Sequence, residues 1–260
     1  MPLAEVNGTI INYRFDGPDE GPVVMFSNSL AAALSMWDMQ IPALVEAGYR
    51  VLRYDSRGHG QSSVSEGPYS IELLAEDAVG LMDAFGLEKV RFCGLSKGGM
   101  VGQMLATQYG DRLHSLVLSS TSAFMSPREI WDKRIETVQK DGMKAVVDAT
   151  IDRWFTKAGQ ALLPLEVDRI RQLILNTPAN GFCACCAAIR DMDQRDSIRA
   201  VSTKTLVVVG ACDPSTPVSS AEFIHQQITP SELMVIAEAA HLVNVEKANV
   251  FNEVLLSFFE

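Results

Sequence analysis

The sequence lacks any apolar run of the roughly 18–20 residues that a membrane-spanning helix requires. Its first ten residues, MPLAEVNGTI, contain neither the basic segment nor the apolar segment of a secretory signal peptide. Basic residues are also few, because 22 lysines and arginines stand against 32 aspartates and glutamates, for a formal net charge of −10. Such a chain repels phosphate backbones and anionic lipid, so we expect neither nucleic acid nor a membrane as its partner.

Cysteine is scarce and odd in number. The five cysteines are Cys93, Cys183, Cys185, Cys186 and Cys212. An odd number without a visible signal peptide favours free thiols in a reducing compartment, so we expect a cytoplasmic protein. No histidine lies near the group at 183–186, and we predict no metal site there. Small side chains at a tight contact between helices are the preferred interpretation of that group.

The remaining composition is that of an ordinary globular protein. Hydrophobic residues make up 47% of the 260 positions and charged residues 21%. This length suits one large domain with an insertion better than two independent domains.

Short apolar runs alternate with helical patterns over most of the chain. Predicted buried strands cover 23–26, 50–54, 90–94, 116–119, 205–209 and 233–236. Apolar residues at helical spacing predict helices over 70–85, 98–109 and 246–259. This alternation predicts an α/β protein whose mostly parallel sheet is covered by helices on both faces.

The alternation stops after residue 122. From 126 to 199 only helical patterns occur, near 142–156, 166–176 and 181–191, with another beginning at Ser126-Pro127. Serine as N-cap, proline at the first helical position and Glu129 two residues later predict a capping box there. We therefore divide the chain into a first core segment (1–122), a helical lid (123–200) and a second core segment (201–260).

A candidate nucleophile lies in Gly94-Leu95-Ser96-Lys97-Gly98, which matches G-x-S-x-G. A predicted strand precedes the motif and a predicted helix follows it, which is the context that the motif requires. The turn holds the serine in a strained conformation, and the glycines leave room for the neighbouring strand and helix. A purely structural glycine-rich turn is the weaker interpretation.

A serine nucleophile needs a base and an acid that orients the base. Asp213 follows the strand at 205–209, and His241 follows the strand at 233–236. These two positions come in the order acid then histidine after the serine, as the motif's fold demands. His59, His114 and His225 fit less well by order or by place, and we interpret them as packing or surface residues. Ser96, Asp213 and His241 are the predicted catalytic residues.

An oxyanion formed during acyl transfer needs donors worth about 3–4 kcal/mol each. One predicted donor is the backbone N–H of Lys97, directly after the nucleophile. The second comes from the loop Ser27-Asn28-Ser29-Leu30, where the N–H of Leu30 is preferred and Asn28 or Ser29 are alternatives. The Lys97 side chain is not predicted to act as a base, because Asp213 and His241 already complete the relay.

These motifs, with Arg57-Gly58-His59-Gly60-Gln61-Ser62, resemble those of the α/β-hydrolase superfamily. Four stretches resemble 3-oxoadipate enol-lactonases more narrowly: 27–30 with 34–38, 54–60, 183–193 (CACCAAIRDMD), and 210–217 with 240–242. The resemblance covers nearly the whole chain, and it implies the α/β-hydrolase fold with a lid inserted between the sixth and seventh strands. The sequence departs from those lactonases at Ala31-Ala32-Ala33, where they carry a polar stretch with glycine, and at Lys97, where they carry an apolar residue.

The resemblance also implies a reaction. It implies hydrolysis of 3-oxoadipate enol-lactone to 3-oxoadipate in the β-ketoadipate pathway of aromatic catabolism, with no metal or organic cofactor. The carboxylate of this small substrate needs a cation, and arginine binds a carboxylate through two parallel hydrogen bonds. Arg134, one helical turn from Trp131, is the predicted substrate contact together with that tryptophan. Arg190 has acidic neighbours and is predicted to form an ion pair instead.

Four other functions fit the same motifs. Another lactone or ester hydrolase, a carbon–carbon hydrolase and a perhydrolase use the same scaffold and triad. A ligand receptor that retains a slow triad is the non-enzymatic alternative. The sequence does not specify an oligomeric state.

Overall fold

The computed structural model describes residues 2–260, and within them the strands form one eight-stranded sheet. The strand order is β1-β2-β4-β3-β5-β6-β7-β8. Strand β2 runs antiparallel to β1 and β4, whereas every other neighbouring pair is parallel. The bounds are β1 (Leu3–Val6), β2 (Thr9–Asp16), β3 (Val23–Ser27), β4 (Arg50–Tyr54), β5 (Val90–Leu95), β6 (Leu113–Ser119), β7 (Thr205–Gly210) and β8 (Ser231–Ile236).

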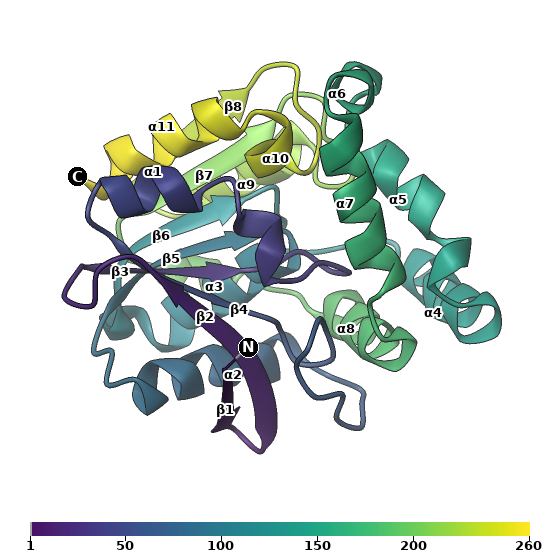
Figure 1. The fold of residues 1–260 in the computed structure, drawn as a ribbon, viewed down its shortest axis with the longest axis horizontal. Helices are drawn as coiled ribbons and strands as arrows, with labels where there is room; N and C mark the ends of the chain where they lie inside the picture. Colours follow the sequence, from purple (N-terminus) through teal and green to yellow (C-terminus); the bar gives the residue numbers. More distant parts are fainter. Residues whose placement is uncertain (1) are drawn as a thin grey trace.

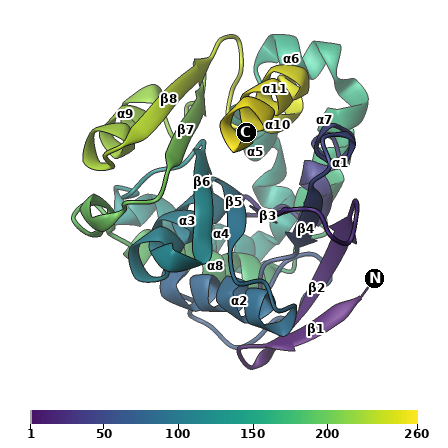
Figure 2. The same cartoon turned by 90° about the vertical axis from the view of Figure 1, so that its left-hand side faces the viewer.

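Helices cover both faces of this sheet (Figures 1 and 2). Helices α1 (Ile41–Glu46) and α11 (Ala248–Phe259) lie on one face. Helices α2 (Ile71–Ala84), α3 (Lys97–Gln108) and α9 (Val218–Gln227) lie on the other. The central strands are therefore buried on both sides, which explains why they read as continuous apolar runs rather than as alternating ones.

Five helices separate β6 from β7 in the chain and gather beyond one end of the sheet, at the right of Figure 1. They are α4 (Arg128–Asp141), α5 (Val147–Trp154), α6 (Lys157–Leu162), α7 (Pro164–Leu175) and α8 (Ala179–Asp191). The two ends of this segment lie side by side, because Phe124 and Asp193 form an isolated β-bridge. The N–H of Gln194 also donates to the carbonyl of Ala123 at 2.8 Å. The exact limits of the lid at 123 and 200 stay a prediction.

The predicted strands and the mostly parallel sheet are confirmed. Strands β1 and β2 have no counterpart among the predicted runs, because they lie at the sheet edge and bury only part of their residues. The predicted C-terminal helix at 246–259 is confirmed as α11, and a short helix that was not predicted, α10 (Val243–Glu246), precedes it.

The predicted capping box at Ser126 is wrong. Helix α4 starts one residue later than expected, with Pro127 as its N-cap in an extended conformation (φ −82°, ψ 157°). No side chain caps this end of the helix, and Ser126 instead lines the cavity described below.

The cysteine-rich segment lies on α8, where Cys183, Cys185 and Cys186 are buried free thiols. Helix α8 packs against α4, and at Gly181 its backbone approaches Gly58 so closely that a Cβ would lie 2.0 Å from the Gly58 carbonyl oxygen. Glycine is therefore needed at 181, where α8 meets the loop at Gly58. The prediction for the cysteines themselves is supported at Cys183, whose thiol lies 3.8 Å from the Ile135 carbonyl oxygen of α4.

Candidate active site

Ser96 lies at the tight turn between β5 and α3. Its backbone has φ 58° and ψ −115°, a left-handed conformation that is strained for a residue with a Cβ. A Cβ on Gly94 would lie 2.1 Å from the Gly98 carbonyl oxygen, and one on Gly98 would lie 2.1 Å from that of Ser27. The turn therefore requires both glycines of the motif. It is fixed by a hydrogen bond from the Ser96 N–H to the Ser119 carbonyl at 2.9 Å.

Asp213 and His241 form a buried pair in the loops that follow β7 and β8. His241 Nδ1 lies 2.8 Å from Asp213 Oδ2. The same carboxylate accepts the Thr216 hydroxyl at 2.7 Å and the N–H groups of Ser215 and Thr216 at 2.8 and 3.1 Å. Burial alone would raise the pKa of Asp213, but His241 and the Thr216 hydrogen bonds together hold that pKa below its ordinary value. The acid thus stays ionised beside the imidazole.

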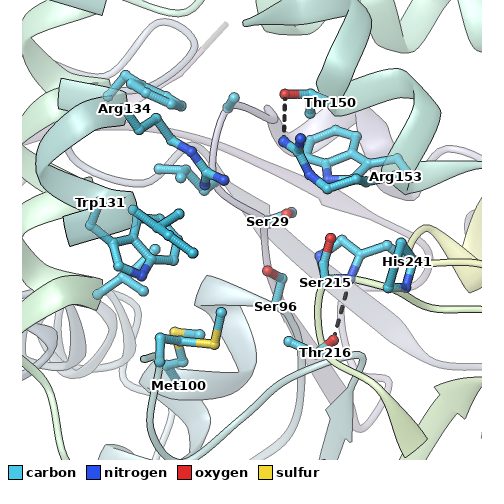
Figure 3. A pocket seen from close by; sticks show the side chains of 18 of the residues that line it. Ser29, Ser96, Met100, Trp131, Arg134, Thr150, Arg153, Ser215, Thr216 and His241 are labelled. Atoms are coloured by element: carbon cyan, nitrogen blue, oxygen red, sulfur yellow. Dashed lines mark hydrogen bonds between the residues drawn. The ribbon is translucent and has the colours of Figure 1, made fainter. Parts of the chain in front are cut away.

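The structure brings the predicted serine and histidine to one cavity. Ser96 and His241 both line it (Figure 3), and His241 is hydrogen-bonded to Asp213 through Nδ1. The indole of Trp154 packs beside His241, with 6.1 Å between ring centroids. The N–H of Leu242 donates to the Trp154 carbonyl at 3.0 Å, so helix α5 is fastened to the histidine loop.

Two backbone N–H groups near Ser96 are free. Among residues 2–260, neither the N–H of Leu30 nor that of Lys97 has a hydrogen-bond acceptor. The Asn28 side chain is already engaged, because it donates to the Tyr54 carbonyl at 2.7 Å and accepts from Trp37 at 2.9 Å. The N–H groups of Leu30 and Lys97 are therefore available for an oxyanion. Ser29, the other alternative, directs its N–H to Met36 Sδ at 3.4 Å, but its hydroxyl is also without a partner among residues 2–260.

The loop that carries Leu30 is held by His59 and Asp55. The N–H of Ala31 donates to His59 Nε2 at 3.0 Å, and that of Leu34 donates to Asp55 Oδ1 at 2.7 Å. Ala31 has φ 60°, a left-handed conformation that favours glycine. His59 is fully buried, in agreement with the packing role predicted for it, and its hydrogen bond with Ala31 holds the loop that carries Leu30.

The Lys97 side chain runs away from the cavity into the core. It is fully buried, and among the described residues its amine has no hydrogen-bond partner. Burial lowers the pKa of this amine below its ordinary value.

The cavity has a volume of about 280 Å³ and lies between the loops that follow the central strands and the lid helices. Its apolar wall comes from Met100, Met125, Ile130, Phe182 and Ile189. Trp131 and Arg134 line it as the sequence predicted, with the Arg134 guanidinium carbon 4.5 Å from the centroid of the Trp131 ring. Arg190 lies elsewhere and pairs with Asp132 and Asp191, so the predicted ion pair is confirmed.

Further polar groups in the cavity were not expected from the sequence. Arg153 of α5 lines it and donates to the Thr150 hydroxyl at 3.2 Å. The hydroxyls of Ser29 and Ser215 also border it and lack partners among residues 2–260. Arg153 follows Asp152 directly in the sequence, and no local motif marks it as a cavity residue.

No three histidine, cysteine, aspartate or glutamate side chains in the described chain are grouped so that they could hold a metal ion. None of the helices between residues 2 and 260 is long and apolar enough to cross a membrane.

A parallel sheet covered on both faces, a strained serine at a strand-to-helix turn and a buried Asp–His pair define a hydrolase of the α/β class. The model of the alpha/beta hydrolase fold matches residues 22–248, and the chain belongs to that family. Within it the chain is 35% identical to 3-oxoadipate enol-lactonase 2 of Acinetobacter baylyi, over 97% of this chain and 96% of the relative.

Two solved structures are similar over almost the whole chain. The enol-lactonase from Burkholderia xenovorans LB400 is 36% identical with a TM-score of 0.97, over 99% of each chain. A hydrolase from Pseudomonas aeruginosa PA01 is 39% identical with a TM-score of 0.95, over 99% of this chain and 98% of that one. The similarity includes the helices between β6 and β7, because the alignments leave almost no residue of this chain out.

Proposed function

We propose that this protein is a serine hydrolase that opens a small carboxylated lactone. The substrate that fits best is 3-oxoadipate enol-lactone, converted to 3-oxoadipate in the cytoplasmic β-ketoadipate pathway. One observation carries the proposal: Ser96 and the Asp213–His241 pair meet at a small cavity whose lid wall presents Arg134, a cation without an acidic partner in the described chain. The similarity to enol-lactonases over nearly the full length supports it.

Ring opening begins with Ser96. Its Oγ attacks the lactone carbonyl while His241 accepts the hydroxyl proton, and the ionised Asp213 stabilises the imidazolium that results. The carbonyl oxygen becomes an oxyanion, which accepts hydrogen bonds from the N–H groups of Leu30 and Lys97. Neither N–H is bonded to another protein group among residues 2–260, so neither has to break a hydrogen bond in order to bind the oxyanion.

Collapse of the tetrahedral intermediate expels the ring oxygen as an enol, to which His241 returns the proton. The enol tautomerises to a ketone, which makes the ring opening effectively irreversible. The acyl chain stays bound to Ser96 as an ester. Water activated by His241 then attacks that ester and releases the second carboxylate of the product.

The lid supplies recognition of the acid. In this proposal the substrate carboxylate binds Arg134, whose guanidinium is held over the Trp131 ring. Burial lowers the pKa of Arg134 from its ordinary value, because it disfavours the charged guanidinium. A bound carboxylate would stabilise that positive charge. The reaction needs no metal and no organic cofactor.

The test compares three substrates: the enol-lactone, a saturated lactone and an uncharged aryl ester. We expect fast turnover of the enol-lactone, lost by at least about 10⁴-fold in Ser96→Ala. Ser219→Ala, an exposed serine on α9, is the matched control and retains full rate. Turnover of aryl esters with no turnover of the enol-lactone would refute the lactone assignment.

Three further assays of the same protein separate the remaining functions. A peroxide-dependent rate with acetate would indicate a perhydrolase, and cleavage of a carbon–carbon bond in a diketone would indicate a carbon–carbon hydrolase. Absence of any turnover, with a ligand that raises the melting temperature, would indicate a receptor.

A further inference from the structure

The lid carries two arginines that differ from all of its others. Within residues 123–200, six arginines form ion pairs with carboxylates: Arg128, Arg169, Arg171, Arg190, Arg195 and Arg199. Arg134 and Arg153 have no carboxylate within 4 Å in the described chain. Both line the cavity above Ser96, and Figure 3 shows their guanidinium groups pointing into it from α4 and α5. In a protein of net charge −10, two unpaired cations at one small cavity indicate an anion-binding wall.

The positive charges of Arg134 and Arg153 repel each other. Burial first, and then the positive charge of Arg134, lower the pKa of Arg153 to about 10. The only side-chain partner of Arg153 among residues 2–260 is the Thr150 hydroxyl, which orients the guanidinium but does not neutralise it. An anion placed between the two groups would remove their repulsion and replace the water that each has lost.

The substrate chemistry indicates which end of the cavity needs this anion site. In a lactone of the proposed kind, the carboxymethyl group is borne by the carbon that holds the leaving ring oxygen. His241 returns its proton to that oxygen, so the carboxylate lies on the His241 side of the site. Helix α5 is on that side, because Trp154 packs beside the His241 ring, and Figure 3 shows Arg153 of this helix on the His241 side of the cavity.

We propose that Arg153 is a specificity-determining residue that binds the substrate carboxylate together with Arg134. This assignment rests on the proposed function for the identity of the lactone, but the anion site itself does not. Arg153 holds the carboxylate of the closed ring next to the leaving oxygen, and the shared site keeps that carboxylate paired after the ring opens into a longer chain. Uncharged esters lack this contact and bind only through the apolar wall.

The test uses Arg153→Met, Arg134→Met and Arg171→Met. The last is the matched control, because Arg171 is a lid arginine that pairs with Asp148 outside the cavity. We expect Arg153→Met to raise KM for the enol-lactone about 10–100-fold, as for loss of a hydrogen bond to a charged group. We expect its kcat/KM for an uncharged aryl ester to change less than about threefold. Arg153→Lys keeps the positive charge without the planar guanidinium. Its KM for the enol-lactone should lie between those of the wild type and Arg153→Met.

Adipate supplies a second readout that does not depend on the lactone. It should inhibit aryl-ester hydrolysis by the wild type competitively, with a Ki that rises about 10–100-fold in Arg153→Met and stays unchanged in Arg171→Met. If the enol-lactone is not turned over but this inhibition behaves as stated, the proposed substrate fails and the anion site stands. The assignment of Arg153 is overturned if Arg153→Met matches Arg171→Met, or if it lowers turnover of both substrates equally.

Discussion

Glu246 of α10 accepts both the backbone N–H and the hydroxyl of Thr156, the N-cap residue of lid helix α6. Its other carboxylate oxygen accepts the N–H of Ala240 at 2.7 Å, immediately before His241. One buried carboxylate therefore joins the lid to the loop that positions the proposed catalytic base. The closeness of this contact is clear at Gly159, where an added Cβ would lie 1.9 Å from Glu246 Oε1.

Replacing Glu246 by glutamine should loosen both the lid and the histidine loop. The amide has one acceptor oxygen where the carboxylate has two, so one of the buried donors loses its partner, at about 1–3 kcal/mol. We expect Glu246→Gln to lower both the melting temperature and kcat, with kcat falling more than KM changes. Glu238→Gln, an exposed glutamate that pairs with Lys247, is the control and should behave as wild type. A lower melting temperature with unchanged kcat would show that Glu246 does not position His241.

Asp213→Asn should lower kcat by about 10⁴-fold, because the amide no longer stabilises the imidazolium. The change also removes a pH-dependent part of the free energy of unfolding. The pKa of Asp213 is lower in the folded protein than in the unfolded chain, so its stabilisation is present above the unfolded value of about 3.9. It disappears as the pH falls through the lowered folded value. Thermal unfolding from pH 7 to pH 3 should therefore show the gap between wild type and Asp213→Asn narrowing in acid, and a gap independent of pH would contradict the assignment.

Lys97→Met should stabilise the protein, because it removes a buried amine without a hydrogen-bond partner among residues 2–260. We expect a gain of about 1–3 kcal/mol near neutral pH, with kcat within tenfold of wild type. The pKa of Lys97 is lowered on folding, so the destabilising charge is fully present below the folded pKa. The charge contribution shrinks as the pH rises from there toward the unfolded value of about 10.4, and the gain should shrink with it.

Denaturant unfolding of Lys97→Met at several pH values measures this effect, with the exposed Lys89→Met as control. A loss of kcat close to that of Ser96→Ala would instead show that the Lys97 amine takes part in the chemistry.

Ala31→Gly should relieve strain in the oxyanion loop. An L-residue at φ 60° is disfavoured by about 1–2 kcal/mol, whereas glycine adopts that conformation freely at a cost of about 0.4–1 kcal/mol in the unfolded chain. We expect a net gain of up to about 1 kcal/mol in thermal unfolding, with kcat/KM within threefold of wild type. Ala32→Gly is the control, since Ala32 does not have a positive φ, and it should destabilise. The interpretation fails if both variants shift the melting temperature in the same direction.

Local sequence was sufficient to predict Ser96, because the glycines and the strand-to-helix context lie within a few residues of it. Asp213 and His241 were predictable from position alone, since each directly follows a predicted strand and parallel strands end at one edge. The roles of Arg153 and Glu246 were not predictable in this way. Arg153 has no carboxylate partner within residues 2–260, because its neighbour Asp152 pairs with Lys157 instead. Glu246 depends on a contact across 90 residues of sequence. Neither a side chain's choice between two neighbouring charges nor a contact between distant segments can be read from a local motif.

Because Phe124 and Asp193 form a β-bridge, the inserted helices leave the core and return to it at nearly the same point. A segment with adjoining ends can be exchanged for another of different length without moving the strands on either side. We therefore expect chimeras that join the core of this chain to the lid of a relative at these two positions to fold. In such chimeras the core would provide the acyl-transfer chemistry, and the lid would determine which carboxylated substrate binds. The two properties could therefore be engineered separately.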